Sequence, residues 1–359
     1  MNSTHTAQLN ATPSPSLVMR SDVEIYIQVV FLVIICIGSV LGNVFVVGIV
    51  IFDHKLHKPT YYFISSLATA DFLVGAIYIP FYIMASLAQK WYLSLTWCKW
   101  NATFISVGLN ASLVTLSLVS VDRYLAITDP LRYQTILTTM RSAVLLLVGW
   151  VHSIFWAFAP QLDWGEIVYQ PKTSTCRPNW GAKGLANRVY TLGLALLPFG
   201  APVICMMYCY CRIFFVARYH VREIKKNSVN TPGSDKIGQR AMETKALKTL
   251  LIVLGAFIVS WLPYTVLSVA KMISKGSWEF SSSTLNAVLT ATLLNGCVNP
   301  VIYAIRDQRF CKAMKRVLCP LSWKDSQEFN SYLSSRRDTT KDSTAQNIEM
   351  GNINFAQES

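Results

Sequence analysis

The sequence predicts an all-α fold, a bundle of seven transmembrane helices followed by a short amphipathic eighth helix. Hydrophobic residues make up 52% of the 359-residue chain and charged residues only 14%, and the mean hydropathy is +0.36. A soluble domain usually carries about a quarter charged residues. Apolar runs of bilayer-spanning length, roughly 17–25 residues, recur along the chain. We place seven of them at 25–51, 60–86, 97–121, 140–160, 187–217, 244–272 and 284–305.

The runs divide the chain into four segments. We expect a polar extracellular tail over 1–24, the seven-helix domain over 25–305, the amphipathic helix over 306–320 and a disordered cytoplasmic tail over 321–359. The fifth run contains Pro198 and Pro202 and the sixth contains Pro263. Membrane helices tolerate proline where neighbouring groups satisfy the freed carbonyls, so these residues predict bends and leave the spans intact.

Basic residues set the orientation. The loops at 52–60, 122–141 and 212–248, together with the chain from 306 onward, hold 23 of the 32 Lys and Arg residues. Because cytoplasmic loops are enriched in Lys and Arg, the N-terminus is expected outside, in a multi-pass plasma-membrane protein. This distribution accounts for the net charge of +13. The bilayer is therefore the expected partner, and no nucleic-acid binding is predicted.

The extracellular side carries the modification signals. Asn2 and Asn10 begin glycosylation sequons on the flexible tail, and both are expected to be modified. Asn101 and Asn110 begin the same pattern, but Asn110 lies inside an apolar run and Asn101 near its outer end, so neither is a predicted acceptor.

Two of the nine cysteines fall outside the membrane on the oxidising face. Cys98 lies at the outer end of the third run, and Cys176 lies in the loop before the fifth. A disulfide between them would hold this loop across the mouth of the bundle. Two unpaired thiols are the alternative. On the cytoplasmic side, Cys319 closes the amphipathic stretch and is a candidate for palmitoylation.

Short characteristic motifs are distributed along the chain, about one to each apolar run. Trp150 lies in the fourth run, and Pro202 and Tyr210 lie in the fifth. The other markers are Gly42-Asn43, LATAD ending at Asp71, Trp91 seven residues before Cys98, Asp122-Arg123-Tyr124, Phe257 with Ser260-Trp261-Leu262-Pro263, and Asn299-Pro300-Val-Ile-Tyr303. With this set of motifs, the chain resembles the class A (rhodopsin-like) G protein-coupled receptors over roughly residues 25–320.

The resemblance implies a sodium site. Asp71 is the one acid that we place in mid-membrane, where a charge costs at least about 2.5–3.5 kcal/mol and normally has a function. In the family the matching Asp binds an allosteric Na⁺, and the partner positions here are Ser112, Asn295 and Asn299. A structural hydrogen-bond centre is the alternative. Gly108 and Gly296 occupy neighbouring positions and supply no side-chain ligand. No other cofactor is predicted.

The resemblance also implies coupling to a heterotrimeric G protein. Arg123 is expected to pair with Asp122 and, in the resting state, with Glu243 at the base of the sixth helix. Breaking that contact would open a cavity for the G protein in which Arg123 and Tyr210 take part. Tyr124, Leu131, Asn299, Pro300 and Tyr303 complete the expected coupling and activation set. An interfacial ion pair that contributes little is the alternative reading of the triplet.

Two further groups of residues follow from the resemblance. Leu113, Pro202 and Phe257 stand where the family keeps an apolar relay beneath Trp261; ordinary packing is the alternative. The polar tail would be phosphorylated by a receptor kinase and then bind arrestin; a plain solvated tail is the alternative. Its candidate phosphorylation sites are Ser334, Ser335, Thr339, Thr340, Ser343 and Thr344.

The expected ligand pocket lacks a charge. The chain looks most like the biogenic-amine branch, but Ile105 replaces the Asp that pairs with the ligand's ammonium, and Leu293 replaces the retinal-binding Lys of the opsins. The pocket is otherwise mostly apolar: Tyr78, Phe81, Tyr82, Ser106, Leu109, Leu194, Pro198, Trp261, Tyr264, Thr265 and Leu289. The charges Asp163, Glu166, Lys172, Arg177, Lys271 and Lys275 are placed on the extracellular rim.

Three kinds of extracellular input remain open. A neutral or lipid-like ligand fits the apolar walls, a peptide fits the charged rim, and a receptor with high basal activity needs no diffusible agonist. A transporter, channel or enzyme would need a series of polar residues across the membrane. These classes are disfavoured, because only His152 among the five histidines lies within a predicted helix. A non-signalling decoy is disfavoured by the intact coupling motifs. The protein is not predicted to be an enzyme.

Overall fold

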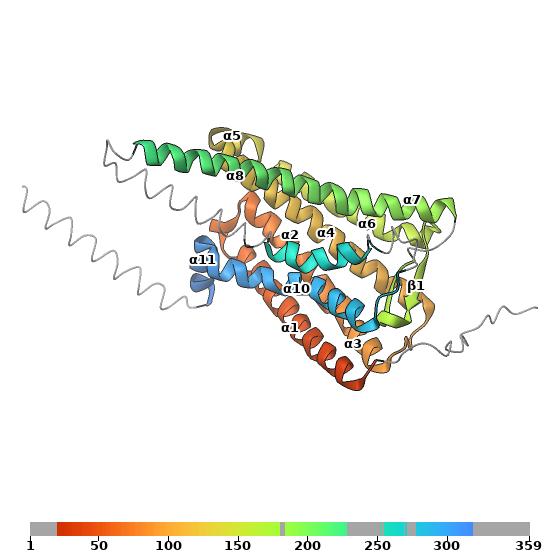
Figure 1. Ribbon diagram of the computed structural model, residues 1–359. Helices are drawn as coiled ribbons and strands as arrows, with labels where there is room; N and C mark the ends of the chain where they lie inside the picture. The colour runs from red at the N-terminus through yellow and green to blue at the C-terminus, as the bar shows by residue number, and fades with distance from the viewer. Residues whose placement is uncertain are drawn as a thin grey trace, which may run out of the picture.

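The computed structural model describes residues 20–179, 184–227, 252, 255–268, 270 and 278–318. Within them lie six helical spans long and apolar enough to cross a membrane, together with the shorter apolar helix Gly255–Ser268 of the sixth predicted run. The spans are α1 (Asp22–Phe52); α2 (Pro59–Leu73) with the π turn η2 (Val74–Tyr78) and α3 (Ile79–Ala88); α4 (Leu95–Thr128); α6 (Thr139–Phe158) with η3 (Ala159–Leu162); α7 (Leu185–Leu194) with the π turn η5 (Ala195–Gly200) and α8 (Ala201–Asn227); and α10 (Ser282–Arg306). The predicted bundle is confirmed (Figure 1).

The helix ends follow from local chemistry. Ser21 caps α1 by accepting a hydrogen bond from the backbone N–H of Glu24, and the acids Asp22 and Glu24 in the first turn complement the helix dipole. Along α1 one face is buried while Ile34 and Leu41 on the other are more than half exposed. Apolar exposure of this kind is the lipid-facing surface of a membrane helix.

The fifth predicted helix contains a π turn at one of its two prolines. Pro198 lies inside η5, between α7 and α8. A second π turn, η2, precedes Pro80 and was not predicted. Proline lacks the N–H that would bond the preceding turn, so the local widening of the helix has a covalent cause.

Two elements outside the bundle were also missed. The loop before α7 forms an antiparallel hairpin of β1 (Ile167–Gln170) and β2 (Thr175–Pro178), joined by η4 (Pro171–Thr173), so the fold is not strictly all-α. The second cytoplasmic loop forms the short helix α5 (Pro130–Ile136). Figure 1 shows α5 at the end of the bundle opposite β1.

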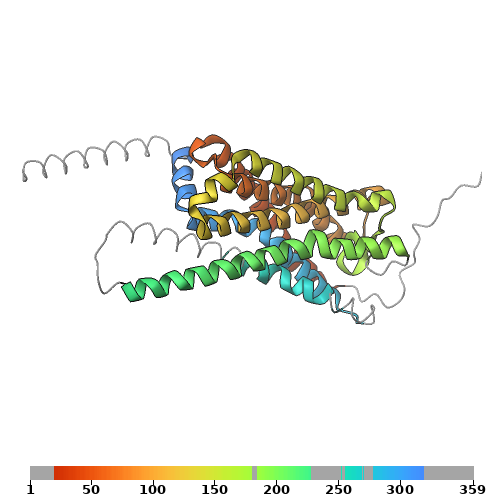
Figure 2. The same ribbon diagram turned by 90° about the horizontal axis from the view of Figure 1, so that it is seen from above.

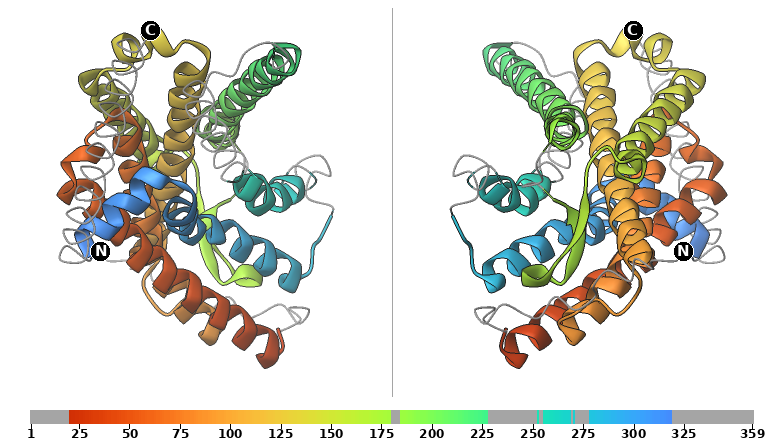
Figure 3. Two further views of the ribbon diagram at one scale, coloured as in Figure 1. Left: turned by 90° about the vertical axis from the view of Figure 1, so that its left-hand side faces the viewer. Right: turned by 90° about the vertical axis from the view of Figure 1, so that its right-hand side faces the viewer.

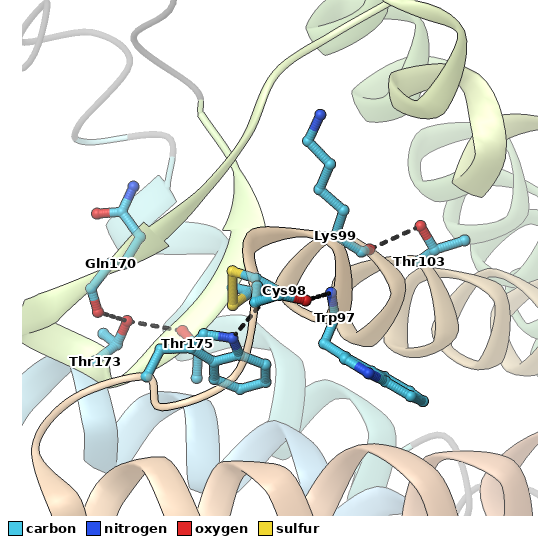
Figure 4. Close-up of a disulfide and its surroundings, with 10 residues drawn as sticks. Trp97, Cys98, Lys99, Thr103, Gln170, Thr173 and Thr175 are labelled. Carbon is cyan, nitrogen blue, oxygen red and sulfur yellow. Dashed lines mark hydrogen bonds between the residues drawn. A yellow bond between two sulfur atoms is a disulfide. The ribbon is translucent and has the colours of Figure 1, made fainter. Parts of the chain in front are cut away.

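The expected disulfide joins the hairpin to the bundle. Cys98 near the start of α4 bonds Cys176 on β2, and both side chains are buried. Figure 4 shows this bond beside the turn of the hairpin, where the Thr173 hydroxyl shares a 2.8 Å hydrogen bond with that of Thr175. The prediction of this pair is confirmed, and the disulfide holds the hairpin at the end of the bundle where α4 begins.

The amphipathic helix α11 (Gln308–Leu318) follows α10 directly, within the stretch expected at 306–320. Asp307 begins it by accepting hydrogen bonds from the backbone N–H groups of Arg309 and Phe310. Phe310 is fully buried beneath it, and Arg316 forms an ion pair with Asp53 at the end of α1. Figure 2 shows α11 and the projecting end of α8 on the same side of the molecule.

Helix α4 organises the core, packing against α2, α6 and α8. It extends to Thr128, beyond the expected end at 121, so Asp122-Arg123-Tyr124 lies inside the helix. Viewed end-on, α10 lies between α1 and the Gly255–Ser268 helix (Figure 3). This arrangement points the polar residues of α2, α4 and α10 at one another.

Candidate functional site

Near the C-terminal end of α4, the carboxylate of Asp122 is the centre of a polar cluster. It is fully buried and lies 2.8 Å from the guanidinium of Arg123. Its oxygens also accept hydrogen bonds from the Thr60 hydroxyl at 2.9 Å and the Tyr133 hydroxyl at 2.6 Å. Thr60 in turn accepts a hydrogen bond from Arg123. Asp122 therefore holds Arg123 against α2 and α5.

Tyr133 brings the second cytoplasmic loop into this cluster. Burial, and then the charge of Asp122, raises the pKa of Tyr133 to about 12, so the phenol stays protonated and donates to Asp122 at physiological pH. Leu131, two residues earlier on α5, has 93% of its surface exposed. Its role as a G protein contact stays a prediction of the resemblance.

The other coupling residues line the same end of the bundle. Tyr210 on α8 and Tyr303 on α10 are buried members of one apolar cluster, and the Tyr303 hydroxyl has no hydrogen-bond partner. The Tyr124 ring lies edge-on to Tyr208, with centroids 6.0 Å apart. Pro300, inside α10, is buried. Glu243, the expected resting-state partner of Arg123, lies outside the described residues.

In mid-bundle, Asp71 joins α2, α4 and α10. It is 5% exposed, and its two oxygens accept hydrogen bonds from the Ser112 hydroxyl at 2.6 Å and the Asn299 amide at 2.9 Å. The structure thus brings two of the three expected partners into direct contact. Asn295 is also buried, but its Oδ1 atom has no hydrogen-bond partner.

A cavity adjoins this cluster. It leaves about 20 Å³ for the centre of a water-sized particle, enough for one water or small ion. Asp71, Ser112 and Asn295 line it, as does Ser39 of α1, which sequence reasoning missed. A small buried hydroxyl in an apolar run was the available signal. The donor set is entirely oxygen, which fits a hard cation.

The expected relay closes the cavity from the other side. Leu113, Phe257 and Trp261 border it and belong to one buried cluster, with the Phe257 and Trp261 rings stacked at 5.9 Å. Pro202 is buried on α8. Trp261 and Asp71 therefore line the same cavity.

Part of the expected ligand pocket assembles near the extracellular end. Ile105 packs among Tyr78, Tyr82 and Leu293, all three of which are buried. Tyr264 stands edge-on to Trp261, with ring centroids 6.3 Å apart. Leu109 lines the cavity below, Pro198 is buried, and Leu289 is partly buried on α10.

Four of the expected pocket residues have other contacts. The Phe81 ring packs against Trp91 and Trp97, and Leu194 packs against the Trp156–Tyr190 cluster. The hydroxyls of Ser106 and Thr265 donate to carbonyls one turn back in their own helices. The wall around Ile105 is therefore more apolar than the residue types alone imply.

A polar network that the sequence reasoning missed closes the mouth. The Gln28 amide donates to the Tyr82 hydroxyl at 2.7 Å, and that hydroxyl donates to the Asn286 amide oxygen at 2.9 Å. Asn286 also donates to the carbonyl of Lys172 on the hairpin turn. Gln28, a polar residue within the first apolar run, was the signal for it.

The charges assigned to the rim are not equivalent. Lys172 pairs with Glu279 at the surface, 2.9 Å apart, and Asp163 and Glu166 line a groove of about 420 Å³ beneath the hairpin. Arg177, by contrast, is partly buried on β2, next to the disulfide-bonded Cys176. Lys271 and Lys275 lie outside the described residues.

Known proteins match this chain over most of its length. The model of the family described as "7 transmembrane receptor (rhodopsin family)" matches residues 42–303. Trace amine-associated receptor 9 of Rattus norvegicus is 34% identical over 290 residues, 78% of this chain and 83% of that protein. The histamine H2 receptor of Cavia porcellus is 34% identical over 294 residues, 81% of this chain and 79% of that protein.

Solved structures give the same picture of the fold. The crystal structure of squid rhodopsin aligns with a TM-score of 0.73 at 22% identity, covering 83% of this chain and 86% of that chain.

Proposed function

The chain belongs to the rhodopsin family of seven-transmembrane receptors, and on that premise we propose that its ligand is a lipid-like molecule and not an amine paired with an acid on α4. As a member of this family it is a multi-pass membrane receptor that signals through heterotrimeric G proteins, and it is not an enzyme. The relatives above are named for amine ligands. Their names alone leave the ligand of this chain open.

One observation carries the proposal. Ile105 stands where the amine branch keeps its acid, and it packs among Tyr78, Tyr82 and Leu293. Helix α4 carries no Asp or Glu before Asp122, and helix α10 carries none. An ammonium placed there would lose its hydration without gaining a counter-charge, which is costly in an apolar site.

A gain-of-function variant tests the proposal. Histamine and 2-phenylethylamine should leave G protein activation by the parent receptor unchanged, measured by resonance energy transfer. Ile105→Asp supplies the missing acid and should create a response, at concentrations at least about tenfold below any seen with the parent. Ile105→Asn is the matched uncharged control. Saturable activation of the parent by either amine would contradict the proposal.

Ligand-free signalling is a second candidate, favoured by the hydrogen bonds that close the mouth. The Gln28–Tyr82–Asn286 network ties α1, α3 and α10 together without a ligand. A receptor held in this way has a basal output set by its own side chains. Basal activation above that of mock-transfected cells, across a full panel of G proteins, would support this candidate.

We further propose that the cavity beside Asp71 binds Na⁺. The residues that would hold the ion are Asp71, Ser112, Asn295 and Ser39, because each lines the cavity and carries a side-chain oxygen. Among the described residues, Asn295 Oδ1 has no hydrogen-bond partner. The bound ion would neutralise the buried carboxylate and stabilise the resting arrangement of α2, α4 and α10.

A melting experiment tests the ion site. Replacing choline chloride with NaCl should raise the melting temperature of the purified receptor by a few degrees at equal ionic strength. Asp71→Asn should remove the increase, because the amide keeps the shape of the site but loses its charge. An equal increase in parent and variant would show that sodium acts elsewhere.

Orientation and regulation complete the proposal. The N-terminus is extracellular, supported by the disulfide-bonded hairpin, because disulfides form in oxidising compartments. Receptor kinases and arrestin act on the tail, which lies outside the described residues together with Asn2, Asn10, Cys319 and the six phosphorylation candidates. These last assignments rest on the family resemblance and the sequence alone.

A further inference from the structure

The extracellular mouth gathers positive charge without a matching acid. Arg20, just before α1, is only 9% exposed, and Arg177 on β2 is partly buried. Arg20 donates to the Gln28 side-chain oxygen, and the Gln28 amide donates to the Tyr82 hydroxyl, so Arg20 belongs to the network at the mouth. Within the described residues no carboxylate lies within ion-pair distance of either one.

Arg177 is the less satisfied of the two. Among the described residues, its buried Nε atom has no hydrogen-bond partner. Successive strand residues point to opposite faces, and Cys176 points at α4 to form its disulfide. The Arg177 side chain therefore points away from α4. A buried N–H group without a partner is costly and calls for a physical explanation.

Arg20 is held in place by neutral groups only. Its guanidinium donates to the Gln28 side-chain oxygen and, at 3.3 Å, to the Ser174 hydroxyl. Burial lowers the pKa of Arg20, and the nearby charge of Glu24 only partly offsets this. Glu24 is exposed and accepts a hydrogen bond from Ser283, so it lies at the surface and does not enter the mouth.

A further hydroxyl faces the same region from α10. It belongs to Thr290, which is 8% exposed. Thr290 lies one turn along the helix from Asn286, whose side chain bonds Tyr82, so the two residues share a face. The hairpin and α10 thus present a buried donor and a buried hydroxyl from two sides.

We propose that the mouth of the bundle binds the carboxylate head of a lipid-like acid, held by Arg177 and assisted by Arg20. This inference rests on the proposed function, because the apolar wall of Ile105 and Leu293 would receive the body of the same ligand. A guanidinium fork matches the two oxygens of a carboxylate. An ammonium ligand would meet two like charges.

Chemically matched probes test the proposal. Octanoic, dodecanoic and hexadecanoic acids are each compared with the primary amide and the amine of the same chain length. At least one acid should change G protein activation and raise the melting temperature of the purified receptor, while its amide and amine act at least about tenfold more weakly. The melting measurement detects binding even if an acid fails to activate.

Two substitutions of Arg177 localise the effect. Arg177→Gln should shift the acid's half-maximal concentration upward by about tenfold or more, and Arg177→Lys should shift it less. Arg177→Glu should reverse the preference, so that the amine of the same length becomes the better ligand. Lys90→Gln removes a charge from an exposed extracellular position and should leave the acid response unchanged.

The outcomes separate this inference from the proposed function. Silence of all three acids in both assays overturns the carboxylate site, as does an acid response that is equal in the parent and in Arg177→Gln. Activation by an amide but not by its acid also overturns it, yet leaves the lipid-like ligand standing. Activation of the parent by an amine would overturn both.

Discussion

Replacing Arg123 with alanine is expected to reduce G protein activation by about thirtyfold or more at matched surface expression. Arg123 is the one cation in the buried cluster formed with Asp122, Thr60 and Tyr133. The family resemblance implies that this side chain contacts the G protein once the sixth helix moves. Alanine removes that contact and also leaves the Asp122 carboxylate buried without its counter-charge.

The measurement is resonance energy transfer between the receptor and a panel of G proteins, with and without an active ligand. Arg132→Ala is the matched control, because it removes a charge from an exposed position on the neighbouring helix α5. Asp122→Asn should act in the opposite direction and raise basal activation, since it frees Arg123. Undiminished coupling of Arg123→Ala would remove the triplet from the coupling mechanism.

The spans were predictable because hydropathy is a local property. A run of apolar residues predicts each helix that crosses the bilayer, and the structure confirms the bundle. Asp71 could also be placed, because a lone acid in such a run has few low-energy environments. Its contacts with Ser112 and Asn299 came from the resemblance, since nothing local links residues on three different helices.

The mouth of the bundle could not be predicted in this way. Gln28 and Asn286 are 258 positions apart, and their contact depends on how α1 and α10 pack. The hairpin was missed because its strands are only four residues long, below the length at which alternation is recognisable. Without the strand, Arg177 looked like a rim charge. With it, the alternation that follows from Cys176 points Arg177 away from α4.

Gly108→Ala is expected to lower the melting temperature strongly, because α4 crosses α2 with no room for a side chain at this position. An added Cβ would lie 2.4 Å from Val74 Cγ2 and 3.2 Å from the carbonyl oxygen of Ala70. Overpacking of this kind costs about 1–3 kcal/mol. Val74→Ala removes the clashing methyl groups, so the double variant should recover most of the loss. Gly48→Ala on α1 is the control, since a Cβ there would meet nothing within 4 Å.

The same substitution also bears on the ion site. Ser112 lies one turn from Gly108 on the same face of α4, and its hydroxyl is 2.6 Å from Asp71. A shift of α4 away from α2 would lengthen that contact. The sodium-dependent rise in melting temperature should therefore shrink in Gly108→Ala and return in the double variant. A sodium effect of unchanged size in a destabilised Gly108→Ala receptor would show that the packing of α2 on α4 and the cavity are independent. A parallel loss and recovery would show that the glycine is needed because it lets the helices approach closely enough to build the site.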